Sequence, residues 1–292
     1  TPPNGLYPFL FLIILLCSLP STAANLSYGF IENRGQISDQ YYHQNPAVKF
    51  LYSGKNLKVH LRKQGFSYEL FRIIQSDEIE QILKNSAPDF RRLRELYLQA
   101  KIETYRIDVE LPGSNPNPEI IAEEPFSDYL NYYTPTTMPN GALRIRHFRK
   151  ITYRNIYPQV DLVFEINNDS REVKYNFIVK PGGHIEDIHL LYEGSEEINL
   201  SEDKITIKTS ISPLVEMIPF SYQKKGEYKI PISVSYEKIS GNEFGFTSEK
   251  YDKAMTLVID PVPAISWGTY YGGSSNEHGM GTAIDVNGNV LA

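Results

Sequence analysis

The stretch that decides the fold is KYNFIV at residues 174–179, a strand-like run that ends at the turn-forming residues KPGG at 180–183. Runs of the same kind lie on both sides of it. Apolar and polar residues alternate in LKVHL at 57–61, in ITIKT at 205–209 and in ISVSY at 232–236. This alternation is the signature of a half-buried strand, so the chain is predicted to be mainly β.

Turn-forming residues punctuate these runs. Compact turns are predicted at Asn140-Gly141 and at Gly241-Asn242, and residues 224–227 are predicted to close another hairpin. Many short strands with regular turns predict a large antiparallel β-sandwich-like domain over residues 25–262.

Composition agrees with strands and bears on the partners. The 292 residues include 21 Tyr and 14 Phe but one Trp, and Tyr and Phe suit half-buried pleated surfaces. The net charge of −6 argues against a nucleic-acid partner, because binding phosphates requires clustered positive charge. We therefore expect no nucleic-acid partner.

One segment departs from the strand pattern. Residues 76–100 contain no Gly, and their apolar residues recur at helical spacing at 79, 82 and 83 and again, after Pro88, at 93, 96 and 97. A short helical insertion between two strands is predicted there.

The first 24 residues carry no charged side chain and are predicted to be a signal peptide. The apolar run at 9–17 is shorter than the ~20 residues that cross a bilayer, and small residues follow it at 21–24. The alternatives are a buried strand or helix, or a membrane anchor. Cleavage near Ala24 would remove Cys17, the one cysteine, and leave a thiol-free mature portion with no transmembrane span. The expected location is secreted or outer cell surface.

The composition changes again after Pro263. The last thirty residues hold six of the 19 glycines and no Lys or Arg. They contain WGTYYGGS at 267–274 and GTAIDVNGNV at 281–290, and this pattern closely resembles an SBBP-type β-propeller repeat. We therefore expect residues 263–292 to be a truncated propeller repeat. Because one blade cannot close a ring, and no initiating Met is present, the chain is expected to be a fragment of a longer protein.

The preceding region resembles the domain of unknown function that stands before such repeats in large exported bacterial proteins. The resemblance rests on FIENRGQ at 30–36 and YRNIYPQVDLVF at 153–164. The family carries no established activity, so the resemblance implies no catalytic residue.

Candidate chemical residues are few, and no catalytic, cofactor-binding or metal-binding residue is predicted. Asp161 lies inside an apolar strand run, where a carboxylate organises a turn more often than it catalyses. Glu32 and Glu165 are the other carboxylates in the family segments. His184 and His189 could contribute to a metal site but fit a turn better. Residues 285–289 resemble part of a calcium loop, although the Asn-Gly pair is explained by a hairpin turn.

Two basic clusters, at residues 91–94 and 144–150, are interpreted as solvated faces, with nucleic acid or acidic glycan as the alternative. The leading functional hypothesis is a non-enzymatic exported protein for adhesion or extracellular binding, with an unknown glycan or protein ligand. The alternative is an extracellular hydrolase acting on polysaccharide or protein, with its site in a missing part or in carboxylates such as Asp161. A third hypothesis is a folding or secretion module for the propeller.

Overall fold

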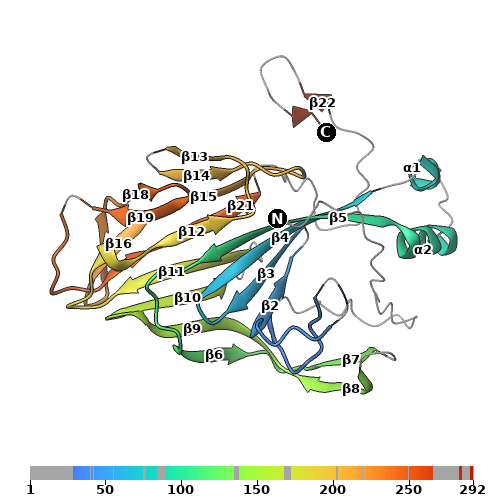
Figure 1. The fold of residues 1–292 in the computed structure, drawn as a ribbon, viewed down its shortest axis with the longest axis horizontal. Helices are drawn as coiled ribbons and strands as arrows, with labels where there is room; N and C mark the ends of the chain where they lie inside the picture. The colour runs from blue at the N-terminus through green and yellow to red at the C-terminus, as the bar shows by residue number, and fades with distance from the viewer. Residues whose placement is uncertain are drawn as a thin grey trace. The chain divides into compact units, whose positions relative to one another are not determined.

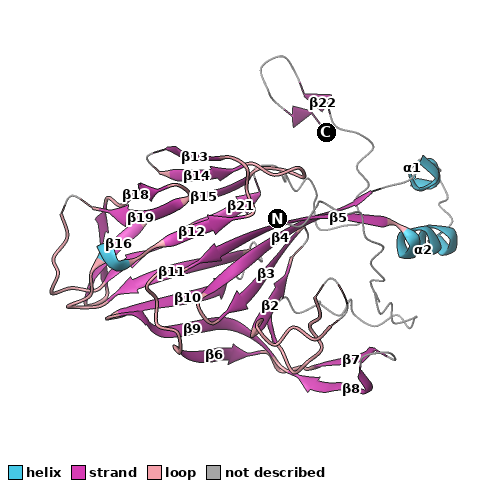
Figure 2. Ribbon diagram, viewed as in Figure 1, coloured by secondary structure: helices cyan, strands magenta, loops and turns pink. Residues whose placement is uncertain are grey.

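The computed structural model describes residues 29–265 and the short segments 283–284 and 290–291. The gaps lie at residues 40, 42, 55, 75–76, 84–89, 135–137, 168–171, 202, 219 and 249. The described part of the chain consists mainly of antiparallel strands (Figure 2). This confirms the predicted mainly β, antiparallel fold class.

A sheet of 15 strands forms most of the structure (Figure 1). In spatial order its strands are β17 (Tyr228–Ile232), β16 (Ser221–Lys225), β20 (Leu257–Ile259), β11 (Val173–Val179), β10 (Val160–Ile166), β9 (His147–Tyr157), β1 (Phe30–Glu32), β2 (Phe50–Ser53), β3 (Leu57–Arg62), β4 (Gly65–Ile74), β5 (Lys101–Glu110), β12 (Leu190–Glu193), β19 (Glu243–Thr247) and β18 (Ser235–Ser240), with β6 (Glu119–Pro125) paired to β9.

Smaller elements complete the described chain. They are a four-stranded sheet of β13 (Ile198–Ser201), β14 (Lys204–Ile207), β15 (Leu214–Met217) and β21 (Val262–Ile265), the pairs β7 (Leu130–Thr134) with β8 (Met138–Ile145) and β22 (Ala283–Ile284) with β23 (Val290–Leu291), the helices α1 (Asp77–Leu83) and α2 (Phe90–Gln99), and the 3-10 turn η1 (Ile185–Asp187).

Contacts divide the described residues into two units. One comprises residues 29–71 and 104–265 and contains the core. The other comprises residues 72–103, 283–284 and 290–291. The second unit contains α1 and α2, where the helical insertion is predicted, and an Arg92–Glu78 ion pair of 2.8 Å joins the two helices.

Strand alternation follows from the sequence and places the core on one face of the sheet. In β10 and β11 the pairs Leu162–Phe177 and Phe164–Tyr175 are buried. The neighbouring pair Glu165–Lys174 points to the opposite face because successive side chains of a strand alternate. One face is thus apolar, and the other combines this charged pair with Val163 and Asn176, which are also buried.

Aromatic rings dominate this core, which accounts for the many Tyr and Phe residues. The Phe66 ring lies 5.1 Å from Phe164 and 5.3 Å from Tyr175, measured between centroids. Tyr175 in turn contacts Phe177, which contacts Phe246. Edge-to-face contacts of this kind add about 0.5–1.5 kcal/mol per pair beyond burial.

The large sheet curls so that its two edge strands come close together at one point. β17 ends at Ile232 and β18 begins at Ser235, although these strands lie at opposite ends of the strand order. Three peptide steps span at most about 11 Å, so the edges approach each other there, while the sheet itself stays open. The prediction of one strand over 232–236 is therefore wrong: the chain leaves one edge and joins the other at residues 233–234.

The four-stranded sheet contributes to the same core through Ile205, Ile207 and Leu214, which are fully buried. Its strand β21 pairs with β15 over residues 262–265. The expected domain boundary at 262/263 therefore falls inside a strand of this sheet.

Two of the predicted turns are observed, and one prediction is wrong. Gly226 and Gly241 have φ angles of +61° and +48° in the turns between β16 and β17 and between β18 and β19. Asn140-Gly141 lies inside β8 instead of between strands. The register of β7 and β8 shifts there, so the positive φ of Gly141 marks an irregular strand and not a hairpin end.

Other predictions lie largely outside the described residues. The expected signal peptide at 1–24, with Cys17, is not described, and neither is the resemblance segment at 267–274. Of the second repeat segment, β22 and β23 pair antiparallel, with Ile284 opposite Val290. The described part of the chain contains no helix of the length and apolarity needed to cross a membrane.

Candidate functional site

The loop that connects β19 to β20 runs from residue 248 to residue 256, and its segment 250–253 is fastened to β16 by one side chain. The Gln223 amide donates to the Asp252 carbonyl at 2.7 Å, and the Asp252 N–H donates to Gln223 Oε1 at 2.9 Å. Gln223 is 2% exposed, because it points inward from β16. A buried, reciprocal pair of hydrogen bonds holds the loop in one conformation.

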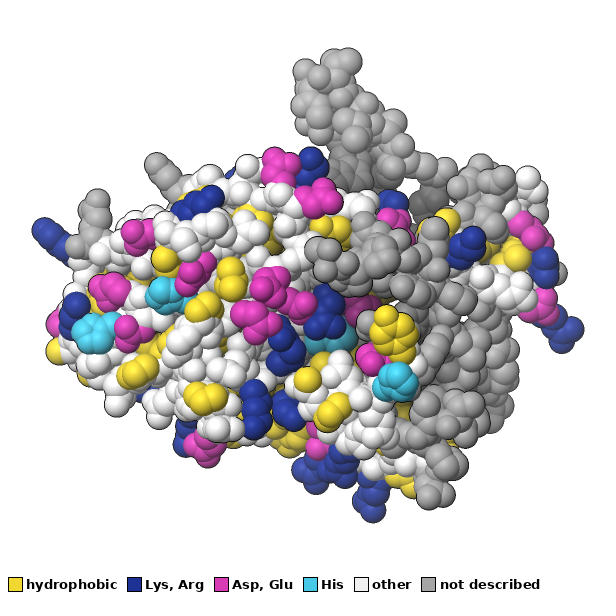
Figure 3. Space-filling model, viewed as in Figure 1, with side chains coloured by type: hydrophobic (Ala, Val, Ile, Leu, Met, Phe, Trp, Pro, Cys, Tyr) yellow, Lys and Arg dark blue, Asp and Glu magenta, His cyan; other side chains and the backbone are white. Residues whose placement is uncertain are grey.

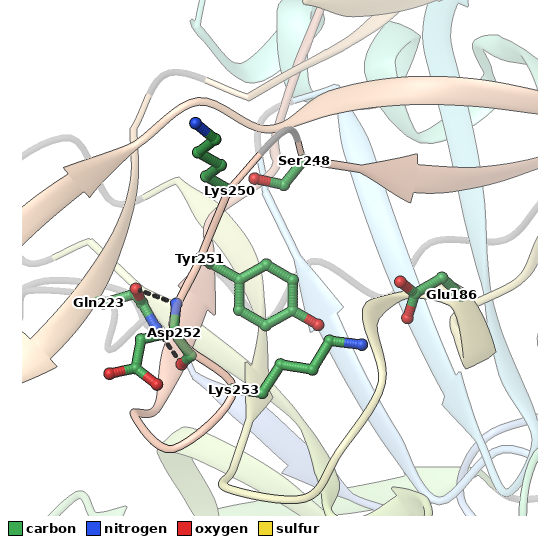
Figure 4. Close-up of a pocket in the computed structure, with 7 residues that line it drawn as sticks. All are labelled: Glu186, Gln223, Ser248, Lys250, Tyr251, Asp252 and Lys253. Atoms are coloured by element: carbon green, nitrogen blue, oxygen red, sulfur yellow. Dashed lines mark hydrogen bonds between the residues drawn. The ribbon is translucent and has the colours of Figure 1, made fainter.

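A pocket of about 450 Å³ lies beside this loop (Figure 4). Its lining residues are all polar: Glu186, Gln223, Ser248, Lys250, Tyr251, Asp252 and Lys253. The volume falls within the ~300–1,000 Å³ range of small-molecule sites. Polar and apolar atoms of these side chains contribute about equally to the walls, which suits a ligand with both hydrogen-bonding groups and apolar faces.

Three side chains of the pocket converge. The Tyr251 hydroxyl and the Lys253 ammonium point toward the side of the pocket where Glu186 lies, whereas Lys250 points away (Figure 4). The Tyr251 oxygen is buried and has no hydrogen-bond partner among the described residues. An unsatisfied buried hydroxyl is costly, so a ligand that supplied its partner would gain free energy.

Other pocket groups are already engaged by the fold. Asp252 Oδ1 accepts the Ala254 N–H at 2.9 Å, and the Ser248 hydroxyl donates to the Ser233 carbonyl at 2.8 Å. The groups left for a ligand are therefore an ammonium, a phenol and a carboxylate. Together they donate and accept hydrogen bonds within one small space.

Asp161 organises a bulge in the chain. Its Oδ1 accepts the Asn155 N–H at 2.8 Å and lies 2.7 Å from the Lys180 ammonium. Asn155 has a φ of +48°, a conformation that an N–H bond to a fixed carboxylate helps to hold. Both contacts of Asp161 are of the kind by which a carboxylate organises a turn.

The FIENRGQ segment forms a compact turn. Asn33 Oδ1 accepts the Gly35 N–H at 2.8 Å, and the Asn33 side-chain amide donates to the carbonyls of Asn45 and Val48. Arg34 pairs with Glu32 at 2.9 Å. The polar groups of this family segment are thus engaged in holding the chain between β1 and β2.

His184 and His189 contact different acidic side chains and do not share a site. His189 Nδ1 lies 2.7 Å from Glu243, while His184 Nδ1 lies 4.0 Å from Glu186. Among the residues that the structure describes, no three His, Cys, Asp or Glu side chains are grouped for a metal ion. Residues 285–289, considered as a calcium loop, lie outside the described residues.

Glu165 and the basic clusters enter ion pairs or ring contacts. Glu165 Oε1 lies 3.1 Å from the Lys174 ammonium. Lys150 pairs with Glu123 at 3.2 Å, and Arg144 lies over the Tyr129 ring. His147 is fully buried, which the solvated-face interpretation of 144–150 did not anticipate, and its ring stacks on Phe126 at 4.5 Å. Figure 3 shows acidic and basic side chains interspersed over the face in view.

A second polar group, on the charged face of β3, β4 and β5, was missed in the sequence. His60 and Ser67 are cross-strand neighbours, with Glu69 and Asp108 beside them. The Ser67 hydroxyl donates to Asp108 at 2.5 Å, while His60 bonds to Glu69 at 2.9 Å. A nucleophile requires its base as hydrogen-bond partner, so this arrangement is an ion-pair network rather than a catalytic triad.

Electrostatics agree with that interpretation. Burial raises the pKa of Glu69, but the hydrogen bond with His60 and the Lys58 charge outweigh it and hold the pKa at about 2. Burial also raises the pKa of Asp108, and its bonds with Arg106 and Ser67 reverse the effect, so the net shift is downward. Both carboxylates stay ionised and paired at neutral pH, the state of structural groups.

The pocket residues carry no sequence motif. Glu186 lies 37 residues before Gln223, and Lys253 lies 30 residues after it. They meet only because the chain at 250–253 reaches both β16 and η1. The one local signal is the density of polar residues at 248–253, which is equally typical of an ordinary loop.

Comparison with known proteins gives one finding. A family model described as a domain of unknown function (DUF7948) matches residues 30–262. No curated protein and no solved structure matches the chain.

Proposed function

Because the chain belongs to the DUF7948 family, a domain of unknown function, we propose a function from its own geometry: it is a saccharide-binding module of an exported protein. The observation that carries the proposal is the convergence of the Tyr251 hydroxyl, the Lys253 ammonium and the Glu186 carboxylate in one pocket.

Saccharides match this set of groups. Each sugar hydroxyl both donates and accepts, so neighbouring hydroxyls satisfy an ammonium, a phenol and a carboxylate together. Fixing the loop through Gln223 lowers the entropy lost on binding. Binding, rather than turnover, is favoured because the groups with catalytic chemistry, Ser67 and His60, are engaged in separate pairs.

The export of the protein belongs to the same proposal. Its support is the charge-free segment 1–24 and the resemblance of residues 263–292 to an SBBP-type repeat, a rigid scaffold that presents ligand-binding loops. Fusing residues 1–24 to a reporter enzyme that is active only outside the cytoplasm would test this part. Reporter activity is expected, and a reporter retained in the cytoplasm would contradict export.

Binding is tested by titrating the chain against a panel of neutral and acidic oligosaccharides by calorimetry. Tyr251→Phe keeps the ring and removes the hydroxyl, so affinity for the best ligand is expected to fall roughly tenfold, the value of one hydrogen bond of about 1.4 kcal/mol. Lys253→Met is expected to lower affinity as well.

Matched controls lie on the β16–β17 hairpin. Tyr228 is 79% exposed and Lys225 is exposed, and neither lines the pocket. Tyr228→Phe and Lys225→Met are expected to bind like the wild type. Equal losses in the pocket and control variants, or no binding to any saccharide of the panel, would overturn the proposal.

A further inference from the structure

An acidic side chain lies in the apolar core. Glu216, on β15, is fully buried, and it points inward beside Ile205, its cross-strand neighbour on β14. The other inward residues of these two strands, Ile207 and Leu214, are aliphatic and fully buried. A carboxyl group at this position therefore needs a particular explanation.

Four tyrosines surround this carboxyl group, each from a different strand of the large sheet. Tyr175 on β11 and Tyr192 on β12 donate to Glu216 Oε2, both at 2.7 Å. Tyr68 on β4 and Tyr236 on β18 complete the shell and interact electrostatically with it. All four side chains are at most 5% exposed.

Among the described residues, no basic side chain is found to act on the carboxyl group. Among the described residues, the titratable groups that face Glu216 from β4, β11, β12 and β18 are the four phenols, and none is basic. An ionised, unpaired carboxylate in such surroundings costs several kcal/mol. Burial raises the pKa of Glu216, and the phenol hydrogen bonds only partly oppose that rise.

Several oxygen atoms of this cluster have no hydrogen-bond partner among the described residues and could share an added proton. Glu216 Oε1 has no hydrogen-bond partner among the described residues, and neither have the hydroxyls of Tyr68 and Tyr236. A protonated Oε1 donates, and a phenol oxygen accepts. Protonation would give Oε1 a hydrogen to donate to a phenol oxygen, and it would avoid an unpaired charge in the core.

We propose that Glu216 is a neutral carboxylic acid in the folded protein. Its contacts with the four tyrosines hold the four-stranded sheet on the large sheet, and this stabilisation depends on pH. As pH rises through the folded-state pKa, this carboxyl group loses its proton. The resulting charge has no cation to pair with, so the packing of β15 against the four tyrosines is weakened.

The sign of the pH effect follows from the direction of the pKa shift. The folded state retains a proton that the unfolded chain releases near the ordinary pKa of a glutamate, about 4.3. The stability that Glu216 contributes is therefore complete below that pH and is lost as pH rises through the folded-state pKa.

The test compares the wild type with Glu216→Gln, a neutral variant of the same shape, by urea unfolding between pH 5 and pH 9. The ratio of the wild-type to the variant unfolding constant is expected to rise about tenfold per pH unit until the folded-state pKa is passed. Glu237→Gln, an exposed change on β18, is the matched control and is expected to give a constant ratio. A constant ratio for Glu216→Gln would overturn the proposal.

A second measurement does not depend on the variant folding. Infrared spectra of the wild type at pH 6–7 are expected to show the carbonyl band of a protonated carboxyl, which disappears at alkaline pH. The pKa of Asp260 is also raised by burial, so the spectrum is repeated on Asp260→Asn. Absence of the band from Asp260→Asn at pH 6–7 would contradict a neutral Glu216.

Discussion

At the scale of the residue, Glu69 and Glu216 are two carboxyl groups that one scaffold treats in opposite ways. Glu69 lies beside Lys58 and His60 at 2.6 and 2.9 Å, and Glu216 lies among phenols. Burial affects both, but only Glu69 has a cation to offset it. Their effects on stability are therefore expected at opposite ends of the pH scale.

Glu69 is expected to stabilise the protein above the ordinary pKa of a glutamate and to lose that effect as pH falls toward about 2. The shift corresponds to about 3 kcal/mol at most. Urea unfolding of wild type and Glu69→Gln should therefore show wild-type stability falling more steeply between pH 6 and pH 2.

The control for this prediction is Glu237→Gln, whose profile should run parallel to that of the wild type. Parallel profiles for Glu69→Gln as well would show that the Lys58–Glu69–His60 contacts contribute nothing measurable.

Residue roles could be predicted only where the sequence is local. Glu32 and Arg34 lie two positions apart in the sequence, within reach of one another at a turn, and their contact is 2.9 Å. The environment of Glu216 needs four strands that lie far apart in the chain, so no spacing in the sequence indicated it.

At the scale of the element, the loop at 248–253 is held by Gln223 rather than by its own turns. Replacing Gln223 with Leu leaves the Asp252 N–H and carbonyl without their side-chain partners. We expect a loss of about 1–3 kcal/mol in the free energy of unfolding and faster amide exchange in the loop.

Hydrogen exchange checks this prediction against Lys225→Leu, an exposed change two residues further along β16. Faster exchange at 250–253 in Gln223→Leu alone supports the fastening role. Unchanged exchange in both variants would mean that the loop is held by other contacts.

Strands could be located from the sequence with fair accuracy, and their ends less so. The alternation at 57–61 corresponds to β3, and the run at 174–179 lies within β11. The run at 232–236 alternates just as well, yet the chain passes between two sheet edges there. The alternation indicates only which side chains are buried. Val234 is buried in the connection, as it would be in a continuous strand, so the pattern does not distinguish the two.

At the scale of the whole molecule, the order of the strands in the large sheet could not be predicted from the sequence. β1 pairs with β9, more than a hundred residues away, and β16 pairs with β20 although β17, β18 and β19 lie between them in the chain. Period-2 alternation fixes the two faces of each strand but not its neighbours. The pocket depends on that order, because Gln223 and the 248–253 loop meet through the β16–β20 pairing.

Both edges of the large sheet carry features that discourage pairing with another chain. Pro231 in β17 lacks an N–H, and β18 carries charged side chains at 237 and 238. These features fit a module that binds a ligand through a pocket rather than by adding a strand at its edge.

The central claim is that the described β domain binds a saccharide in the pocket beside residues 248–253. The most direct measurement is NMR mapping of the backbone amides of the labelled chain, titrated with the tightest-binding oligosaccharide of the panel. We expect the perturbed amides to lie at 248–253, Gln223 and Glu186, and the sugar to be recovered intact. Perturbations confined to other surfaces, or cleavage of the sugar, would contradict this claim.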